Sequence, residues 1–129
     1  IDDRKLKRAG LDYWDKLNIT YYDNEEAFFR LHADKTIYCF STKSPRSYTE
    51  VTYPEDVFLM FGRETAGLPE HILAERPDTC VRIPMREGLR SLNLSNSVAV
   101  AIYEVLRQRD FAGLLSEGTP TTFSWEDVR

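Results

Sequence analysis

The stretch VFLMFG, at residues 57–62, decides the predicted fold. Its apolar residues follow one another without alternating with polar ones, which is typical of a strand buried on both faces. Residues 36–43 (TIYCFSTK) repeat this pattern and end in hydroxyl-bearing side chains. Strands of this kind belong to mostly parallel sheets that are covered by helices on both faces. The two runs therefore predict an α/β domain.

Further elements are predicted on either side of these two runs. In chain order we expect a strand at 16–22, a helix at 23–34, the strand at 36–43, a loop at 44–56 with a short edge strand at 48–52, the strand at 57–62, a helix at 69–76, a strand at 80–85 and a helix at 94–109. Asp23 is the expected cap of the first helix, because Glu26 follows three residues later. Pro69 is well suited to be the first residue of the second helix.

The composition limits the class of protein. The chain has 129 residues, 42% hydrophobic and 29% charged, which fits one globular domain. No apolar run approaches the roughly 20 residues of a membrane span. Two histidines without ligand spacing predict no metal site. Cys39 and Cys80 sit in apolar runs, so we expect buried free thiols in a cytoplasmic protein.

The net charge of −4 disfavours general electrostatic binding to nucleic acid. The segment RKLKRAG, residues 4–10, is nevertheless a local basic patch. It is either the solvated face of a helix or a set of phosphate contacts, and the sequence leaves both open.

The polar chemistry lies where the predicted strands end. Residues 40–43 (FSTK), 61–69 (FGRETAGLP) and 83–96 (IPMREGLRSLNLSN) each follow or close a strand. Because the carboxyl ends of parallel strands meet at one edge of a sheet, these segments should converge there. We expect the functional site at that edge.

Several chemistries are disfavoured at this edge. Gly62 and Gly67 have the spacing of a phosphate loop, but Leu68 stands where its lysine would be. The chain contains no G-x-G-x-x-G motif, which disfavours a dinucleotide site, and no G-x-S-x-G motif, which disfavours a hydrolase with a serine nucleophile. Paired-carboxylate chemistry would need two acids at the strand ends, and only Glu64 and Glu87 qualify. Methyl transfer from a sulfonium donor survives these eliminations, because such a donor is already activated and the protein mainly positions it.

Two long segments resemble a known family. Residues 59–69 (LMFGRETAGLP) and 83–104 (IPMREGLRSLNLSNSVAVAIYE) resemble the second and third motifs of the knotted SPOUT-class RNA 2′-O-methyltransferases. Residues 2–15 (DDRKLKRAGLDYWD) are similar to a segment of the subfamily that methylates the ribose of the wobble cytidine or uridine of tRNA. The resemblance implies a C-terminal trefoil knot, S-adenosylmethionine (SAM) as cofactor, a homodimer, and the anticodon region of tRNA as partner.

The resemblance also implies roles for individual residues. Contacts to SAM are expected from Phe40, Gly62, Gly67, Ile83, Met85, Ser91 and Leu92, and the active-site polar residues are expected to be Glu64 and Asn93. Structural alternatives remain: Gly62 as a turn residue, Glu64 as a helix-entry charge, and Ser91 or Asn93 as a helix cap. We expect a backbone contact from Phe40, and a cap from Asn93 or Ser95 with Ser91 facing the ligand.

The first motif of that family, an Asn-rich stretch ending in an arginine, does not occur in residues 1–129. A strand with its following helix takes on the order of 30 residues or more, and we expect such a block upstream of Ile1. Residues 1–129 are then a single SPOUT methyltransferase domain lacking its N-terminal strand and helix. The alternatives are an enzyme acting on another RNA, such as rRNA, and a non-catalytic RNA-binding module of the same fold.

The helix at 94–109 is apolar nearly all round. Leu94, Val98, Ala101, Ile102 and Val105 share one face, and Ala99, Val100 and Tyr103 spread apolar surface over the rest. Such a helix must be covered on two sides. The sheet is one cover, and the other is a second subunit, with Tyr103 at the interface, or alternatively the N-terminal helix.

Overall fold

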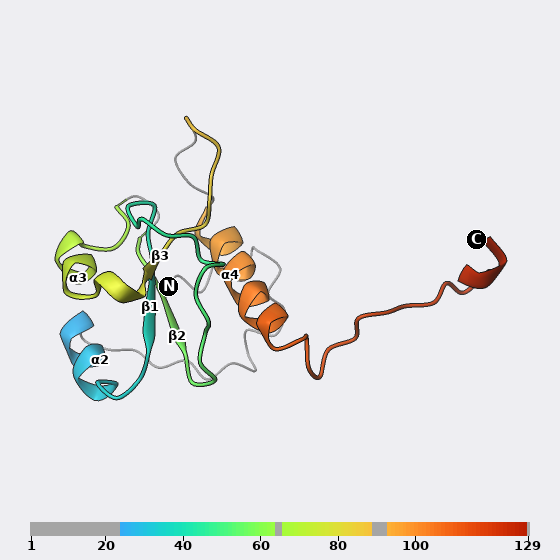
Figure 1. The fold of residues 1–129 in the computed structure, drawn as a ribbon, viewed down its shortest axis with the longest axis horizontal. Helices are drawn as coiled ribbons and strands as arrows, with labels where there is room; N and C mark the ends of the chain where they lie inside the picture. Colours follow the sequence, from blue (N-terminus) through green and yellow to red (C-terminus); the bar gives the residue numbers. More distant parts are fainter. Residues whose placement is uncertain (1–23, 64–65, 89–92, 129) are drawn as a thin grey trace.

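The computed structural model describes residues 24–63, 66–88 and 93–128, which Figure 1 shows in colour. A three-stranded parallel sheet forms the centre, with the order β2-β1-β3. Its strands are β1 (Ile37–Phe40), β2 (Phe58–Phe61) and β3 (Cys80–Val81). The predicted parallel α/β fold is confirmed. The predicted strand at 16–22 and the basic residues Arg4, Lys5, Lys7 and Arg8 lie outside the described residues.

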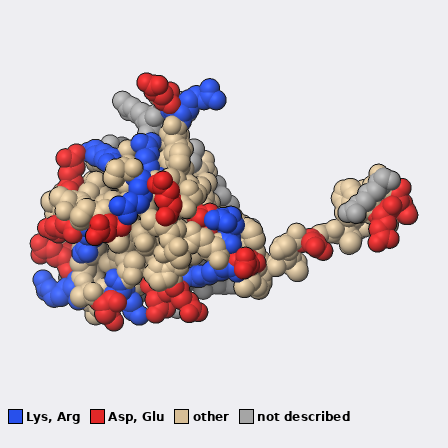
Figure 2. Space-filling model, viewed as in Figure 1, with Lys and Arg blue, Asp and Glu red and all other residues tan. Residues whose placement is uncertain are grey.

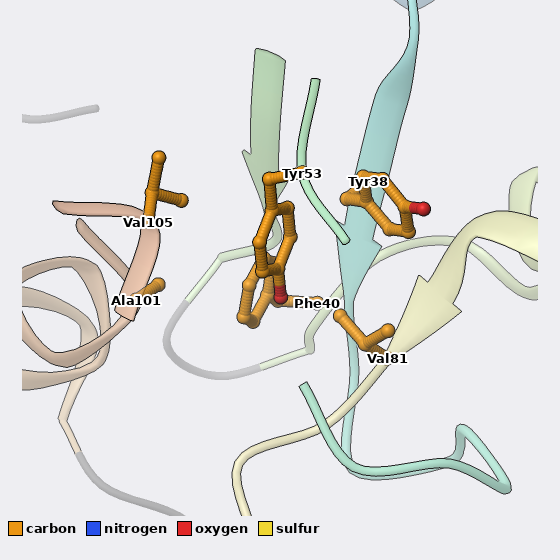
Figure 3. Close-up of a cluster of buried hydrophobic side chains, with 6 residues drawn as sticks. All are labelled: Tyr38, Phe40, Tyr53, Val81, Ala101 and Val105. Atoms are coloured by element: carbon orange, nitrogen blue, oxygen red, sulfur yellow. The ribbon is translucent and has the colours of Figure 1, made fainter. Parts of the chain in front are cut away.

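Helices cover both faces of the sheet, as predicted (Figure 1). On one face lie α2 (Glu25–Leu31) and α3 (Glu70–Glu75), and on the other lies α4 (Leu94–Gln108). Side chains of β1 alternate between the two layers: Ile37 and Cys39 pack with α2 and α3, whereas Tyr38 and Phe40 pack with α4. Figure 3 shows the second cluster, with Ala101 and Val105 of α4 on one side and Val81 of β3 on the other.

The buried thiols are confirmed. Cys39 and Cys80 face each other in the register of β1 and β3, and both are free and buried. Burial raises the pKa of the Cys39 thiol to about 11, so this side chain stays protonated at neutral pH and acts as a small apolar residue.

Both predicted helix starts require a correction of one residue. Asn24 caps α2, because its Oδ1 accepts the backbone N–H of Ala27 at 2.8 Å. Pro69 is the cap of α3 and not its first helical residue, since its ψ of 139° is extended. The capping residue has an extended backbone, as Asn24 and Pro69 both have. Sequence spacing alone did not show which of the neighbouring polar residues Asp23 and Asn24 is the cap.

The edge strand predicted at 48–52 is wrong. This segment turns instead, because Ser47 N–H bonds the Glu50 carboxylate at 2.7 Å and the Ser47 carbonyl accepts the N–H of Glu50. Ser47 makes an isolated bridge with Arg82. The predicted strand at 80–85 is also shorter than expected: β3 ends at Val81, and Arg82 beyond it pairs with Ser47 in the isolated bridge.

The chain wraps around the end of β3 after leaving β1. Ser41 N–H donates to the carbonyl of Val81 at 3.0 Å on the β1 side. Arg82 N–H donates to Arg46 O at 2.9 Å, and Tyr48 N–H donates to Arg82 O at 2.8 Å. Since successive residues in extended chain direct their backbone groups to opposite sides, the chain at Val81 and Arg82 runs between β1 and residues 46–48. Residues 41–48 therefore pass from one side of β3 to the other.

Helix α4 carries two different faces. Ala101 and Val105 are buried against the sheet, whereas Ile102 and Tyr103 are exposed, Tyr103 to 61%. Ala99 is also exposed on that side. The expectation that Ile102 shares the face of Ala101 and Val105 is therefore wrong. Beyond Gly113 the chain runs away from the domain and ends in a short 3₁₀-helix, η3 (Trp125–Val128), as Figure 1 shows.

Ile72 should be a large contributor to stability, because α3 has no other buried residue. It is 2% exposed and packs with Ile37, Cys39 and Leu68. Truncating Ile72 to Ala is expected to lower the free energy of unfolding by about 2–4 kcal/mol. Urea unfolding checks this, with Leu31→Ala as control, since Leu31 is 65% exposed. Equal losses in the two variants would contradict the assignment of the core.

Candidate functional site

The three strand ends converge as predicted. Phe40 lies opposite Phe61 of β2 and opposite Val81 of β3 in the same parallel register. The segments that follow these residues therefore leave the sheet at one edge. We call the backbone and side chains of residues 40–44, 62–63, 66–68 and 82–88 the carboxyl edge.

The loop after β2 folds back tightly on Gly62. A Cβ atom at Gly62 would lie 2.0 Å from the carbonyl carbon of Gly67 and 2.1 Å from the backbone nitrogen of Leu68. Gly67 closes the loop by donating its N–H to Arg63 O at 2.8 Å, with a φ of +69° that favours glycine. Both glycines are thus required by the loop itself. Their predicted contacts to a ligand stay predictions, and Glu64 lies outside the described residues.

Phe40 contributes backbone and not its ring to this edge. Its ring is buried and stacks on Phe61 with centroids 4.7 Å apart (Figure 3 shows Phe40 in the core). A ligand at the edge would meet the main chain of Phe40, as the sequence analysis expects. The hydroxyl of the next residue, Ser41, accepts the N–H of Lys43 at 3.1 Å and shapes the turn.

The segment after β3 combines apolar anchors with an exposed tip. Ile83 packs partly buried against the cluster of Figure 3, and Met85 is half-buried. Arg86 and Glu87 are exposed, and Gly88 has a φ of +90°. The predicted ligand residues Ser91 and Leu92 lie outside the described residues.

Asn93 caps α4. Its Oδ1 accepts the backbone N–H of Asn96 at 2.9 Å, which satisfies one donor of the first helical turn. The expectation that Asn93 or Ser95 caps this helix is confirmed, and the capping residue is Asn93. Its predicted catalytic role stays a prediction. The capping bond uses one of the two lone pairs of Oδ1, and the amide nitrogen takes no part in that bond.

Cations gather at the carboxyl edge of this acidic chain. They are Lys43, Arg63, Arg82 and Arg86. Lys43 forms an ion pair with Glu70 of α3 at 2.5 Å. Figure 2 shows basic and acidic side chains interspersed over the visible face, so attraction of a polyanion depends on local cations more than on overall charge.

Sequence reasoning missed the role of Arg82. Its Nη1 donates to Thr42 O at 3.0 Å, which fastens the turn after β1 to the segment after β3. Its Nε is buried without a hydrogen-bond partner in the described part of the chain. The sequence signal for this role was a single cation, Arg82, between the apolar residues Val81 and Ile83.

No group of three or more His, Cys, Asp or Glu among the described residues is arranged to hold a metal ion. Within the same residues, none of the helices is both long and apolar enough to cross a membrane.

Comparison with known proteins places the chain in a family. The model of the SpoU rRNA Methylase family matches residues 1–103, which include the whole carboxyl edge. The chain belongs to the SpoU methylase family. The resemblance drawn from residues 59–69 and 83–104 is thereby confirmed.

Individual relatives agree with this family. A protein of Geobacillus stearothermophilus is 47% identical over 116 residues, which cover 88% of this chain and 74% of the relative. One of Methylovorus glucosotrophus, a tRNA (cytidine(34)-2′-O)-methyltransferase, is 43% identical over 88% of this chain and 74% of its own. A solved structure on the 2-OH methylation of C/U34 on tRNA superposes with a TM-score of 0.73 at 39% identity, over 86% of this chain and 72% of its own.

Gly62 provides a test of the closed loop in this SpoU family chain. We expect Gly62→Ala to lower the free energy of unfolding by about 2 kcal/mol or more, because the added methyl group meets backbone that cannot yield without opening the loop. Gly118→Ala is the matched control, since nothing lies within 4 Å of a Cβ there. Thermal unfolding in which the two variants behave alike would show that the loop is not closed on Gly62.

Proposed function

We propose that this chain transfers a methyl group from SAM to the ribose 2′-hydroxyl of the wobble nucleotide, cytidine or uridine, of tRNA. The observation that carries the proposal is the likeness to a tRNA (cytidine(34)-2′-O)-methyltransferase, 43% identical over 88% of this chain. That span must include most of the carboxyl edge. The family description, which names rRNA, favours ribose methylation of rRNA as the second candidate.

The residues of the carboxyl edge fit SAM. Ile83 and Met85 offer half-buried apolar surface, and the backbone at Phe40, Gly62 and Gly67 is free of bulky side chains or has its side chain turned into the core. Such a mixture suits a ligand with an aromatic base and a polar amino-acid end. Ser91 and Leu92 complete the proposed set of SAM contacts.

The reaction needs alignment more than strong acid–base groups. When bound, SAM supplies a methyl group on a positively charged sulfur, which is already a good leaving group. The ribose oxygen forms a bond to the methyl carbon, the carbon–sulfur bond breaks, and the hydroxyl proton passes to a nearby acceptor or water. The work of the chain is to hold the hydroxyl in line with that bond. We propose Glu64 and Asn93 as the polar residues beside the hydroxyl.

Contacts to tRNA must come from local cations, because the chain has a net charge of −4. We propose that the exposed Arg63 and Arg86 meet phosphates next to the reacting ribose. The basic segment 4–10 is a further proposed contact. Reaction on tRNA makes the cytoplasm the proposed location.

A trefoil knot is also proposed. Its support is the path of residues 41–48, which pass from one side of β3 to the other so that the chain after Val81 leaves between β1 and residues 46–48. The likeness to SpoU family structures favours the same topology.

We further propose a homodimer that pairs through α4. Ala99, Ile102 and Tyr103 lie three and four positions apart, so they form one stripe, and all are exposed. An apolar stripe on a helix whose other face is already buried is suited to a second subunit. Tyr103, which is 61% exposed, has the largest side chain of this stripe.

Transfer of labelled methyl groups tests the proposed function. The protein is incubated with labelled SAM and two unmodified tRNA transcripts, identical except that one carries a 2′-deoxyribose at position 34. We expect label in the ribose transcript only, mapped to nucleotide 34. A parallel incubation contains unmodified rRNA in place of tRNA, and label appearing only in that rRNA would favour the second candidate. Binding of tRNA without any binding of SAM, measured by calorimetry, would show a non-catalytic RNA-binding module.

Sedimentation equilibrium tests the proposed dimer. Placing a charge in the stripe with Tyr103→Glu should weaken self-association by at least about tenfold, because it buries an unpaired carboxylate. Leu31→Glu is the control, since Leu31 is exposed on α2 on the opposite layer. A dimer that persists unchanged in Tyr103→Glu would exclude this stripe as the interface.

A further inference from the structure

Gln108, in the last turn of α4, forms hydrogen bonds to the backbone of residues 51–53 through both the oxygen and the nitrogen of its side-chain amide. Its Oε1 accepts the N–H of Tyr53 at 3.0 Å, and its Nε2 donates to the carbonyl of Val51 at 2.9 Å. The amide thus bonds a stretch of main chain as a peptide group of a neighbouring strand would. Residues 51–53 gain through this one side chain the partners that a ladder would otherwise supply.

Glu104 fixes the orientation of that amide. Its carboxylate is buried and accepts a bond from Gln108 Nε2 at 2.9 Å as well as from Nε and Nη2 of Arg107, at 2.8 and 2.9 Å. These bonds, above all those from Arg107, hold the pKa of Glu104 below its ordinary value, so the carboxylate is ionised at neutral pH. Because an ionised carboxylate only accepts, the nitrogen of Gln108 must face it and the oxygen must face Tyr53.

The backbone of residues 51–53 leads directly to the carboxyl edge. The hydroxyl of Tyr53 donates to Tyr48 O at 2.6 Å, and Tyr48 N–H donates to Arg82 O at 2.8 Å. Tyr53 is buried between α4 and β1, with its ring 4.9 Å from that of Tyr38 (Figure 3). An unbroken series of hydrogen bonds therefore joins Gln108 to Arg82, the residue immediately before Ile83.

We propose that Gln108 is a positioning residue for the methyl-transfer site. It holds residues 48–53 against α4, and these residues hold Arg82 and the segment 83–88 in the arrangement that receives SAM. The part of this inference that concerns SAM rests on the proposed function. Gln108 itself lies at the far end of α4 from Asn93, and within the described part of the chain its hydrogen bonds go to Val51, Tyr53 and Glu104, which are outside the proposed SAM set.

Hydrogen exchange in the absence of any ligand tests the positioning. Gln108→Met keeps the length of the side chain and removes both amide groups, and Arg107→Met is the matched control because Arg107 bonds Glu104 but not residues 51–53. We expect the amides of Tyr48, Tyr53 and Arg82 to exchange at least about tenfold faster in Gln108→Met than in Arg107→Met. Equal exchange in the two variants would overturn the inference.

Titration with SAM tests the consequence for the site. We expect Gln108→Met to weaken SAM binding at least fivefold while kcat at saturating SAM changes less than twofold, and Arg107→Met to leave both nearly unchanged. A Gln108→Met protein that is folded and binds SAM like the wild type would overturn the inference.

The experiments distinguish a failure of the proposed function from a failure of this inference, and they provide a second variant in case Gln108→Met does not fold. A wild-type protein that does not bind SAM contradicts the proposed function, whereas the exchange rates still decide the role of Gln108. If Gln108→Met does not fold, Gln108→Asn replaces it, because Asn keeps an amide near the ionised Glu104 but is one methylene too short to bond both Tyr53 N–H and Val51 O. Faster exchange at Tyr48 and Arg82 in that variant supports the inference, and wild-type exchange there overturns it.

Discussion

The parallel register of β1 with both of its neighbours is the constraint on which the rest of this structure depends. Phe40 faces Phe61 on one side and Val81 on the other, so three strands end at the same level. The side chains of β1 are buried on both faces, which fixes α4 against one face and α2 with α3 against the other. A shift of β1 by one residue would exchange the two layers of side chains and disrupt both clusters.

The carboxyl edge follows from that register. Its loops contain little regular secondary structure. Two local devices shape them: the close approach of Gly67 to Gly62, and the hydrogen bond from the Arg82 guanidinium to the carbonyl of Thr42. The first device closes the loop after β2 on itself, and the second joins the segments that leave β1 and β3. The edge is therefore built as a set of backbone segments held at fixed distances, which is what a reaction limited by alignment requires. Gln108 extends this support to the opposite end of α4.

The sequence predicted the elements whose signal is local and missed those that depend on distant contacts. Residues 36–43 and 57–62 predicted buried parallel strands because burial on both faces leaves an unbroken apolar run. The hydrogen bond between Gln108 and the backbone of Tyr53 joins positions 55 residues apart in the chain. A polar residue at the end of a predicted helix gives no indication of such a distant partner. The edge strand predicted at 48–52 failed for the same reason, since side chains of Ser47, Glu50 and Gln108 satisfy that backbone. The resemblance to a family drew attention to Gly62, Phe40 and Asn93, but the close packing around Gly62 and the stacking of Phe40 came from the fold. The cap made by Asn93 was predictable from its residue type. The ligand roles of these residues stay predictions.

The most direct test of the central claim is amide hydrogen exchange of the wild-type protein with and without SAM. If the edge fixed by β1 receives the methyl donor, amides at residues 40–43, 62–63 and 82–86 should become protected, while those of α2 in the opposite layer should not change. Protection confined to α2 or α3, with the carboxyl edge unaffected at saturating SAM, would contradict it.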